Sequence, residues 1–501
     1  MGSLGPNLLD LAEELVLNVI EQINSQLALC NLARTCGRLQ ELTEPYIYST
    51  VLVRTGKDAE ILLESLFARP KRLSSILDLA IRYRHEREQG IEVLNSVISR
   101  IPKLKRLHVE APCCNDEHWS AGRGHRWESA GRIDIARLFE AAVGLPPLIQ
   151  PQGLEMLQSL ILHSHGPETH SQTSGVLRNL SDKYNLNRSA IIFAHPQLRH
   201  IKLSCFDVLP SLANLPFLSD PRQHHTTRLT HLTFEECNIH ATGLFALLAL
   251  PAALSHLTIG ERIYHFVLPP FRPLMHDAPA LFATLCQQRN SLASLKHVGG
   301  IPISDIPFAH ITNPEHLAVL SNVRDLALAQ SSVLLRYLLH GGAPASLRVL
   351  RLLDTPMYSL DGEQELLKLI VQKIPQLQTF EIVLSQARPM ELRVSGINDV
   401  QTVLNGLMVN EATRRMIRKA GAVFKGAKIR MRMFVLTPVH YIPPYMLGEE
   451  VPVEVQAWDS EDPDMFGGKV YREEEVQRVT REQLMGSEES EALSMFLQPE
   501  L

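Results

Sequence analysis

The chain has 501 residues, of which 45% are hydrophobic and 21% charged, and its formal net charge is -5. This length and hydrophobic content are typical of a protein with a large core, and the charge balance offers no general attraction to nucleic acid or to a membrane surface. The seven cysteines follow no disulfide spacing, and the sequence has neither a secretory signal nor an apolar run of about eighteen residues. We therefore expect reduced thiols, no membrane association and a location in the cytoplasm or nucleus.

The first organised stretch spans residues 8–53 and has two apolar series at helical spacing. One series steps by four and the other by three or four: Leu11, Leu15, Val19 and Ile23, then Leu29, Leu32, Cys36 and Leu39. This spacing predicts two short amphipathic helices joined at Asn24-Ser25. A unit of this size leaves much apolar surface exposed, so it needs a partner inside or outside the chain.

The same stretch resembles an F-box in its fungal form, the module that docks on the Skp adaptor of cullin-RING ubiquitin ligases. The resemblance is carried by these apolar series, by Thr35 to Leu39 and by the closing segment Glu44 to Tyr48. Ala12 stands where the family usually has proline. The resemblance implies that six residues bind the adaptor: Leu11, Leu15, Val19, Leu29, Leu32 and Leu39.

A second pattern, Leu-x-x-Leu-x-Leu or a close variant, recurs along the rest of the chain. We call each copy of it a strand frame. Ten copies begin at positions 76, 104, 157, 198, 229, 254, 292, 323, 347 and 377. The last two apolar places of each copy are two residues apart, which predicts a short strand with one face in a core. Helical patterns separate the copies, so we expect parallel strands joined by helices. In the weakest copy, His297 takes the last apolar place.

These copies predict an α/β fold, a leucine-rich-repeat horseshoe or solenoid, preceded by a small helical F-box-like module. One such repeat does not bury its own apolar face, so neighbouring repeats must stack and leave a concave strand face. An armadillo-like helical array and an ordinary α/β domain are the alternatives. The regular asparagine ladder of such repeats is represented only at Cys237-Asn238.

Polar insertions and histidines offer weak candidate sites. Cys113, Cys114, His118 and His125 lie close in sequence, but adjacent cysteines rarely ligate one zinc ion together, so we expect no metal. Histidines beside the strand frames are more typical of solvated or core-edge positions than of ligands. Examples beside the frames are His200, His231 and His256.

The carboxy-terminal part changes character. Residues 398–422 have helical spacing, and 428–436 alternate with the period of a strand. Basic residues between 414 and 432 form either a solvated face or a contact with acidic surface such as the segment from Glu449 onward. Residues 446–501 are acidic, which predicts a loosely packed tail.

No motif of an enzyme site is present: the sequence has no Gly-x-Ser-x-Gly elbow, no phosphate loop and no dinucleotide fingerprint. We expect no catalytic residue and no cofactor. The domains are therefore a helical module at 8–53, a solenoid at 54–445 and a tail at 446–501.

Together with the resemblance, these domains predict a substrate-recruiting adaptor subunit of an SCF-type ubiquitin ligase. Its partners would be a Skp-family adaptor, a cullin held through that adaptor, and an unknown protein substrate. The alternative is a ligase-independent protein-binding scaffold whose amino-terminal helices only cap the solenoid.

Overall fold

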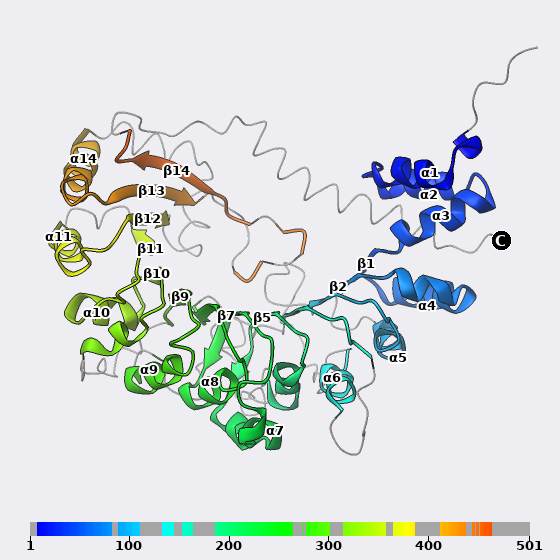
Figure 1. The fold of residues 1–501 in the computed structure, drawn as a ribbon, viewed down its shortest axis with the longest axis horizontal. Helices are drawn as coiled ribbons and strands as arrows, with labels where there is room; N and C mark the ends of the chain where they lie inside the picture. The colour runs from blue at the N-terminus through cyan, green and yellow to red at the C-terminus, as the bar shows by residue number, and fades with distance from the viewer. Residues whose placement is uncertain are drawn as a thin grey trace, which may run out of the picture. The chain divides into compact units, whose positions relative to one another are not determined.

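The structure is a computed structural model that describes residues 8–82, 89–110, 133–144, 153–163, 186–263, 274, 277–300, 314–356, 364–385, 411–436, 443–445, 447–449 and 451–462. The described residues form two compact units, one up to residue 161 and one from residue 162. Each unit is taken by itself (Figure 1).

The amino-terminal module of the first unit has three helices where the sequence predicts two. They are α1 (Glu13–Glu21), α2 (Gln26–Ala33) and α3 (Gly37–Ile47), after a short 3-10 turn, η1 (Leu8–Asp10). The second predicted helix breaks at Thr35, whose hydroxyl donates to the Leu32 carbonyl at 2.7 Å, and Cys36 is extended. Such local hydroxyl bonds compete with the helical ladder. The apolar spacing continues through the break and so conceals it.

Four strands follow in the first unit, and the chain returns between them through short helices. The strands are β1 (Thr50–Val53), β2 (Asp78–Arg82), β3 (Arg106–Glu110) and β4 (Ser159–His163), which ends at the boundary between the units. The helices are α4 (Gly56–Ala68), η2 (Pro70–Ser75), η3 (Ile91–Leu94), α5 (Asn95–Ile98) and α6 (Ile135–Val143). Strands β1, β2 and β3 are parallel neighbours in chain order. The predicted frame residues Leu79 and Ile81 are buried.

The second unit continues the alternation of strands and helices. Its strands are β5 (His200–Ser204), β6 (Asp207–Val208), β7 (His231–Ile239), β8 (His256–Glu261), β9 (Ser294–Val298), β10 (Asp325–Ala329), β11 (Val349–Pro356), β12 (Thr379–Ser385), β13 (Arg430–Leu436) and β14 (Glu454–Asp459). Its helices are η5 (Asn187–Ala194), η6 (Pro210–Asn214), α7 (Pro216–Ser219), η7 (Pro221–Gln223), α8 (Ala241–Leu248), α9 (Ala278–Cys286), η9 (Pro314–Val319), α10 (Val333–His340), α11 (Gln364–Lys373) and α14 (Glu411–Gly426).

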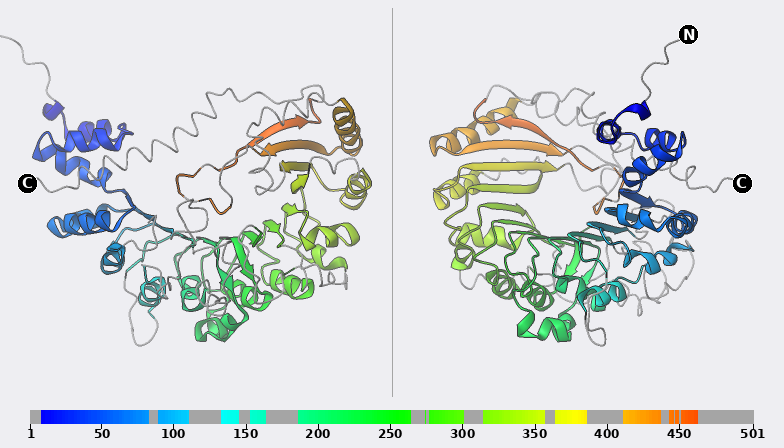
Figure 2. Two further views of the ribbon diagram at one scale, coloured as in Figure 1. Left: turned by 180° about the vertical axis from the view of Figure 1, so that it is seen from behind. Right: turned by 45° about the vertical axis from the view of Figure 1, so that its right-hand side comes forward.

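Strands β5 and β7 to β13 pair in parallel and in chain order, whereas β14 pairs antiparallel with β13 and β6 pairs with β7. The sheet is not closed. Helices α8 to α11 lie along one side of these strands (Figure 2). A mixed α/β fold with a large parallel sheet is therefore confirmed.

The frame residues form rows that run from strand to strand across the sheet. One row in the second unit consists of Ile201, Leu232, Leu257, Leu295, Leu326, Leu350, Phe380 and Met431. Every member of this row is buried. Burying a leucine-sized side chain stabilises a fold by roughly 1.5–3 kcal/mol, so such rows hold successive strands together.

The carboxy-terminal end differs in part from its prediction. The predicted strand at 428–436 appears as β13, and the predicted helix overlaps α14, although residues 398–410 lie outside the described part. Residues 454–459, expected in a loosely packed tail, instead form β14 with Val455, Ala457 and Trp458 buried. The acidic residues of this segment conceal its apolar positions. Residues 463–501 and the insertion around Cys113 lie outside the described residues.

Within the described residues, no helix is long and apolar enough to cross a membrane.

Candidate docking surface on the amino-terminal helices

Helix α1 has two apolar sides, and only one of them faces its own chain. Val16 and Ile20 are buried at 0% and 1% exposure, whereas Leu15 and Val19 are 50% and 44% exposed. Leu11, which precedes the helix, is 38% exposed. Because residues four apart lie on one helix face, Leu15 and Val19 form a solvent-facing pair. We call Leu11, Leu15 and Val19 the α1 stripe.

The other three predicted adaptor-binding residues do not belong to this surface. Leu29 and Leu39 are each 5% exposed and lie in the core of the module, and Leu32 is partly buried. Apolar spacing identifies a face of a helix, but it does not say whether that face meets the same chain. Leu27, which lies outside both apolar series, is 48% exposed in the first turn of α2.

Polar contacts hold the three helices together without involving the α1 stripe. The Tyr46 hydroxyl donates to Glu21 Oε1 at 3.0 Å, which links α3 to α1. The Gln26 side-chain amide donates to the Ile47 carbonyl at 2.6 Å and links α2 to α3. The burial of Cys30 raises the pKa of its thiol to about 11, so this cysteine is an uncharged part of the core.

The module packs onto the rest of the first unit through α3 and the residue after it. Glu44 of α3 pairs with Arg69 at 2.9 Å and with Arg72 at 2.6 Å. Tyr48 shares a hydrogen bond with Ser65 of α4 at 2.6 Å, and the Arg72 guanidinium lies 4.9 Å from the centre of the Tyr48 ring. Burial raises the pKa of Tyr48. Helix α3 and Tyr48 therefore make the contacts that would cap the first strands. The α1 stripe takes no part in these contacts.

The backbone at Ala12 already has the geometry that proline imposes. Ala12 is the N-cap of α1, with φ at -58°, and makes no side-chain cap. Proline fixes φ near -65°. Ala12 therefore enters α1 with a φ that proline could also adopt.

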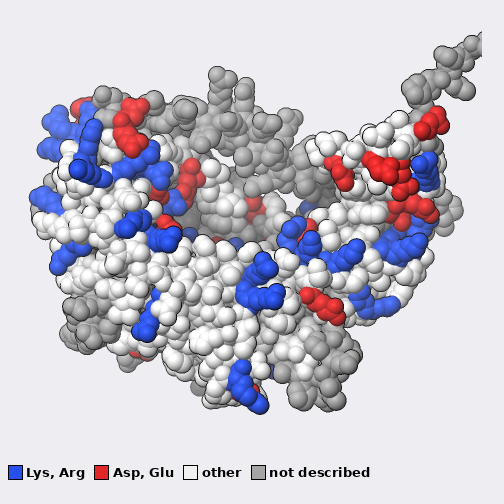
Figure 3. All heavy atoms as spheres, in the orientation of Figure 1, with Lys and Arg blue, Asp and Glu red and all other residues white. Residues whose placement is uncertain are grey.

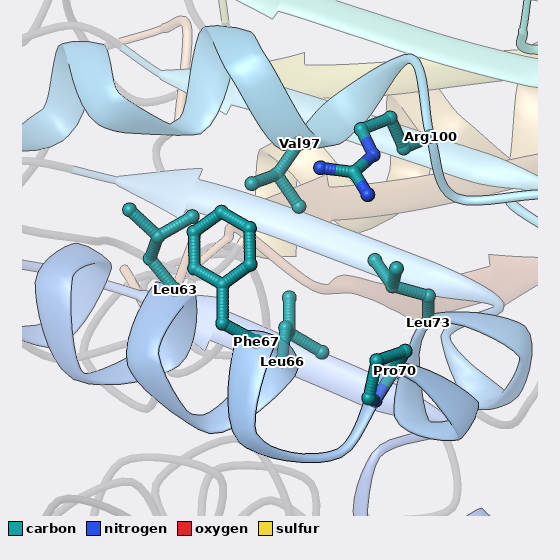
Figure 4. Close-up of a pocket in the computed structure, with 7 residues that line it drawn as sticks. All are labelled: Leu63, Leu66, Phe67, Pro70, Leu73, Val97 and Arg100. Atoms are coloured by element: carbon teal, nitrogen blue, oxygen red, sulfur yellow. The ribbon is translucent and has the colours of Figure 1, made fainter.

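A shallow apolar pocket lies elsewhere in the first unit, between α4, η2 and α5 (Figure 4). Leu66 and Val97 line it, and Phe67 is 59% exposed. The Arg100 guanidinium lies 5.9 Å from the centre of the Phe67 ring. This contact covers part of an aromatic surface, and the pocket brings together no pair of acid and base groups.

A buried polar cluster joins neighbouring strands of the second unit to helix α10. His297, in the weakest frame, is 0% exposed, and its Nδ1 lies 2.6 Å from Ser332 Oγ. Its Nε2 lies 3.3 Å from Glu261 Oε1. Ser332 Oγ also accepts from the Leu334 N–H at 3.2 Å and so caps α10. A hydroxyl, an imidazole and a carboxylate thus contact one another in sequence. All three are buried, and they connect β8, β9 and the start of α10.

A second buried group surrounds Asn238, the predicted remnant of an asparagine ladder. Its side-chain amide donates to Asp207 Oδ1 at 2.7 Å, one strand away. Arg262 Nη2 lies 3.5 Å from the same oxygen. Burial raises the pKa of Asp207, opposed by Arg262 and by the hydrogen bond from Asn238. Asn238 therefore links the neighbouring strands β6 and β7, although not through a regular ladder.

The basic residues of the carboxy-terminal part divide between the two predicted roles. Lys and Arg side chains gather over α14 (Figure 3), where Arg415, Lys419 and Lys425 are exposed. Arg430 of β13 instead pairs with Asp459 at 2.6 Å and with Glu461 at 3.2 Å. The acidic segment after Glu449 thus binds part of the basic run.

Among the described residues, no group of three or more His, Cys, Asp or Glu side chains has a metal-binding arrangement. The cysteines and histidines weighed for zinc, Cys113, Cys114, His118 and His125, lie outside those residues. No protein-family model matches the chain, and no curated protein matches it as a relative.

Proposed function

We propose that this chain is a substrate-recruiting adaptor subunit of an SCF-type ubiquitin ligase. In this proposal, α1 to α3 dock a Skp-family adaptor, which holds a cullin, and the repeats bind a target protein. The observation that carries the proposal is the α1 stripe: Leu11, Leu15 and Val19 are exposed on a module that is otherwise folded and attached to the chain. Exposed apolar surface on a folded module is typical of a protein-binding site.

The strand and helix order supports the repeat part of the proposal. Strands β5 and β7 to β13 pair in chain order, the helices lie on one side, and the frame residues form buried rows. These are the properties expected of a leucine-rich solenoid. The strand side opposite the helices would then bind the target.

In such an assembly the chain supplies position, and the chemistry belongs to other subunits. Holding an acceptor lysine close to the charged conjugating enzyme replaces a bimolecular encounter with an effectively intramolecular reaction. The buried Ser332, His297 and Glu261 have no part in this role.

The α1 stripe provides the sharpest test. A purified Skp-family adaptor is titrated with the wild-type chain and with the double variant L15D/V19D. Central interface residues often contribute about 2 kcal/mol each, which is a factor of about 30 in affinity. We therefore expect binding to fall by at least that factor. The variant F245D is the matched control, because Phe245 is an apolar residue of similar exposure, 46%, on α8 of the second unit.

The capping alternative makes the opposite prediction. Because α3 makes the contacts to α4 and η2, L15D/V19D leaves the cap intact. If the folded double variant binds the adaptor as tightly as the wild type, the adaptor role is wrong. The helices then serve as a cap for a ligase-independent scaffold.

A further inference from the structure

Three histidines form a ladder on the side of the sheet that is opposite the buried rows. His200, His231 and His256 stand at matching positions of β5, β7 and β8. The rings of His231 and His256 are stacked, with centroids 4.1 Å apart and planes 6° from parallel. The His200 ring meets His231 edge-on at 4.5 Å. His200 and His256 are exposed, and His231 is partly buried.

Neighbouring hydroxyl groups hydrogen-bond to two of these rings at Nδ1. The Thr230 hydroxyl lies 2.9 Å from Nδ1 of His231 and 3.1 Å from the Arg199 carbonyl oxygen. The Ser255 hydroxyl lies 2.8 Å from Nδ1 of His256 and 3.0 Å from the Thr230 carbonyl oxygen. A protonated imidazole donates from both of its nitrogens. Because Nδ1 of His231 and of His256 already has a partner, Nε2 is the atom through which a protonated ring would donate to an added anion.

Two of the ladder histidines, His200 and His231, have lowered pKa values. Burial lowers the pKa of His200, and Arg199 and His256 lower it further. Burial also lowers the pKa of His231, with His256 and His200 as the charged neighbours. Two parallel rings do not direct their lone pairs at one point, so the ladder is not a metal chelate. An added anion is then the group that would favour protonation.

The charged groups around the ladder are mostly basic. Lys202 of β5 pairs with Glu235 of β7 at 2.6 Å. Lys296 of β9 lies in the same row as Lys202 and makes no ion pair within the described part of the chain. Beyond β9, the exposed carboxylate nearest in register is Asp325 of β10. Exposed Arg199 and Arg228 stand just before β5 and β7.

We propose that the histidine ladder, with Lys202 and Lys296, is a docking strip for an acidic segment of a partner protein, and that docking takes up a proton. The inference rests on the repeat half of the proposed function and names the chemistry of its target. It does not depend on adaptor docking. A carboxylate placed against Nε2 stabilises the imidazolium, and each unit of resulting pKa increase strengthens binding about tenfold at low pH.

Isothermal titration calorimetry with an octa-aspartate peptide tests this strip at low ionic strength. We expect the peptide to bind about tenfold more tightly at pH 5.5 than at pH 7.5. Titrations at pH 6 in two buffers of different ionisation enthalpy should show uptake of about half a proton for each peptide bound, because the slope of the logarithm of affinity against pH equals the proton uptake. The measurements are repeated with L15D/V19D, which should bind the peptide like the wild type whether or not the adaptor proposal holds.

Two ladder variants and one control complete the design. The triple variant H200Q/H231Q/H256Q should lose the pH dependence, whereas H224Q, outside the ladder, should keep it. The single variant H256K carries a fixed charge and should bind at pH 7.5 nearly as tightly as the wild type does at pH 5.5. H256K also tests the proposal if the triple variant does not fold. Equal wild-type affinity at both pH values, no proton uptake, or no gain in affinity of H256K over the wild type at pH 7.5 would overturn the proposal.

Discussion

The amino-terminal module and the carboxy-terminal strand β14 each cover strands of their own unit, but they treat their apolar residues differently. In β14, Val455, Ala457 and Trp458 are all at most 6% exposed. In the module, Leu15 and Val19 are about half exposed although α3 already makes the capping contacts. A segment that only caps has no reason to leave such residues in water. The comparison therefore favours a binding role for the α1 stripe.

The largest expected difference between these regions is in stability. Trp458 is 2% exposed, and its ring packs so closely on α14 that a Cβ at Gly421 would lie 2.1 Å from it. Trp458→Ala should therefore lower the free energy of unfolding by about 3–5 kcal/mol. Leu15→Ala should change it by no more than about 0.5 kcal/mol, because its side chain is half exposed. Urea unfolding followed by circular dichroism measures both.

A loss of more than about 2 kcal/mol in Leu15→Ala would break the comparison, because it would mean that the α1 stripe supports the fold. A small loss of unfolding free energy in Trp458→Ala would also break the comparison, because it would mean that the buried residues of β14 do not support the fold.

The strand frames were predictable because their meaning is local. Two apolar residues that are two apart, followed by a helical pattern, specify a strand with one buried face, and β2 to β5 and β7 to β12 appear at the predicted frames. The break at Thr35 was not visible, because apolar spacing continues across it. Strand β14 was not visible either, because Glu454 and Asp459 hide a short apolar segment in an acidic region.

The residues predicted from the sequence to bind the adaptor are of two kinds in the structure, exposed and buried, and the sequence pattern did not separate them. Leu15 and Leu29 follow the same spacing rule, yet one is exposed and the other is buried. The difference is set by the packing of α2 against α3, which is tertiary information. The histidine ladder had a signal, since three histidines share one frame position, but its stacking depends on the pairing of β5, β7 and β8.

A smaller effect concerns the charged groups that hold β14 against β13. Burial alone would raise the pKa of Asp459, but the hydrogen bonds from Arg430 and from the Glu461 N–H, together with the charges of Arg430 and Arg432, outweigh burial and hold this pKa below its usual value of 3.8. A carboxyl with a lowered pKa stabilises the fold above its unfolded pKa and loses that contribution as pH falls through the folded value. Asp459→Asn should therefore cost about 1 kcal/mol at pH 7 and much less below about pH 3.

Urea unfolding at the two pH values measures this difference. Glu461→Gln is the control, because Glu461 pairs with the same arginine but is 64% exposed, so its loss should be close to zero. A cost for Asp459→Asn that is the same at both pH values would show that shape, not charge, holds β14 in place.

The smallest expected effect is at Ala12, where the module's apolar stripe enters its helix. The φ of -58° suits proline, and the Ala12 carbonyl, which proline keeps, accepts the first helical hydrogen bonds from Leu15 and Val16. Ala12→Pro should raise the free energy of unfolding by about 0.4–1 kcal/mol, because proline restricts the unfolded chain. Asn18→Pro, in the middle of α1, should lower it by about 3 kcal/mol. Thermal unfolding compares the two, and a loss of stability in Ala12→Pro would show that the entry into α1 differs from the one that proline favours.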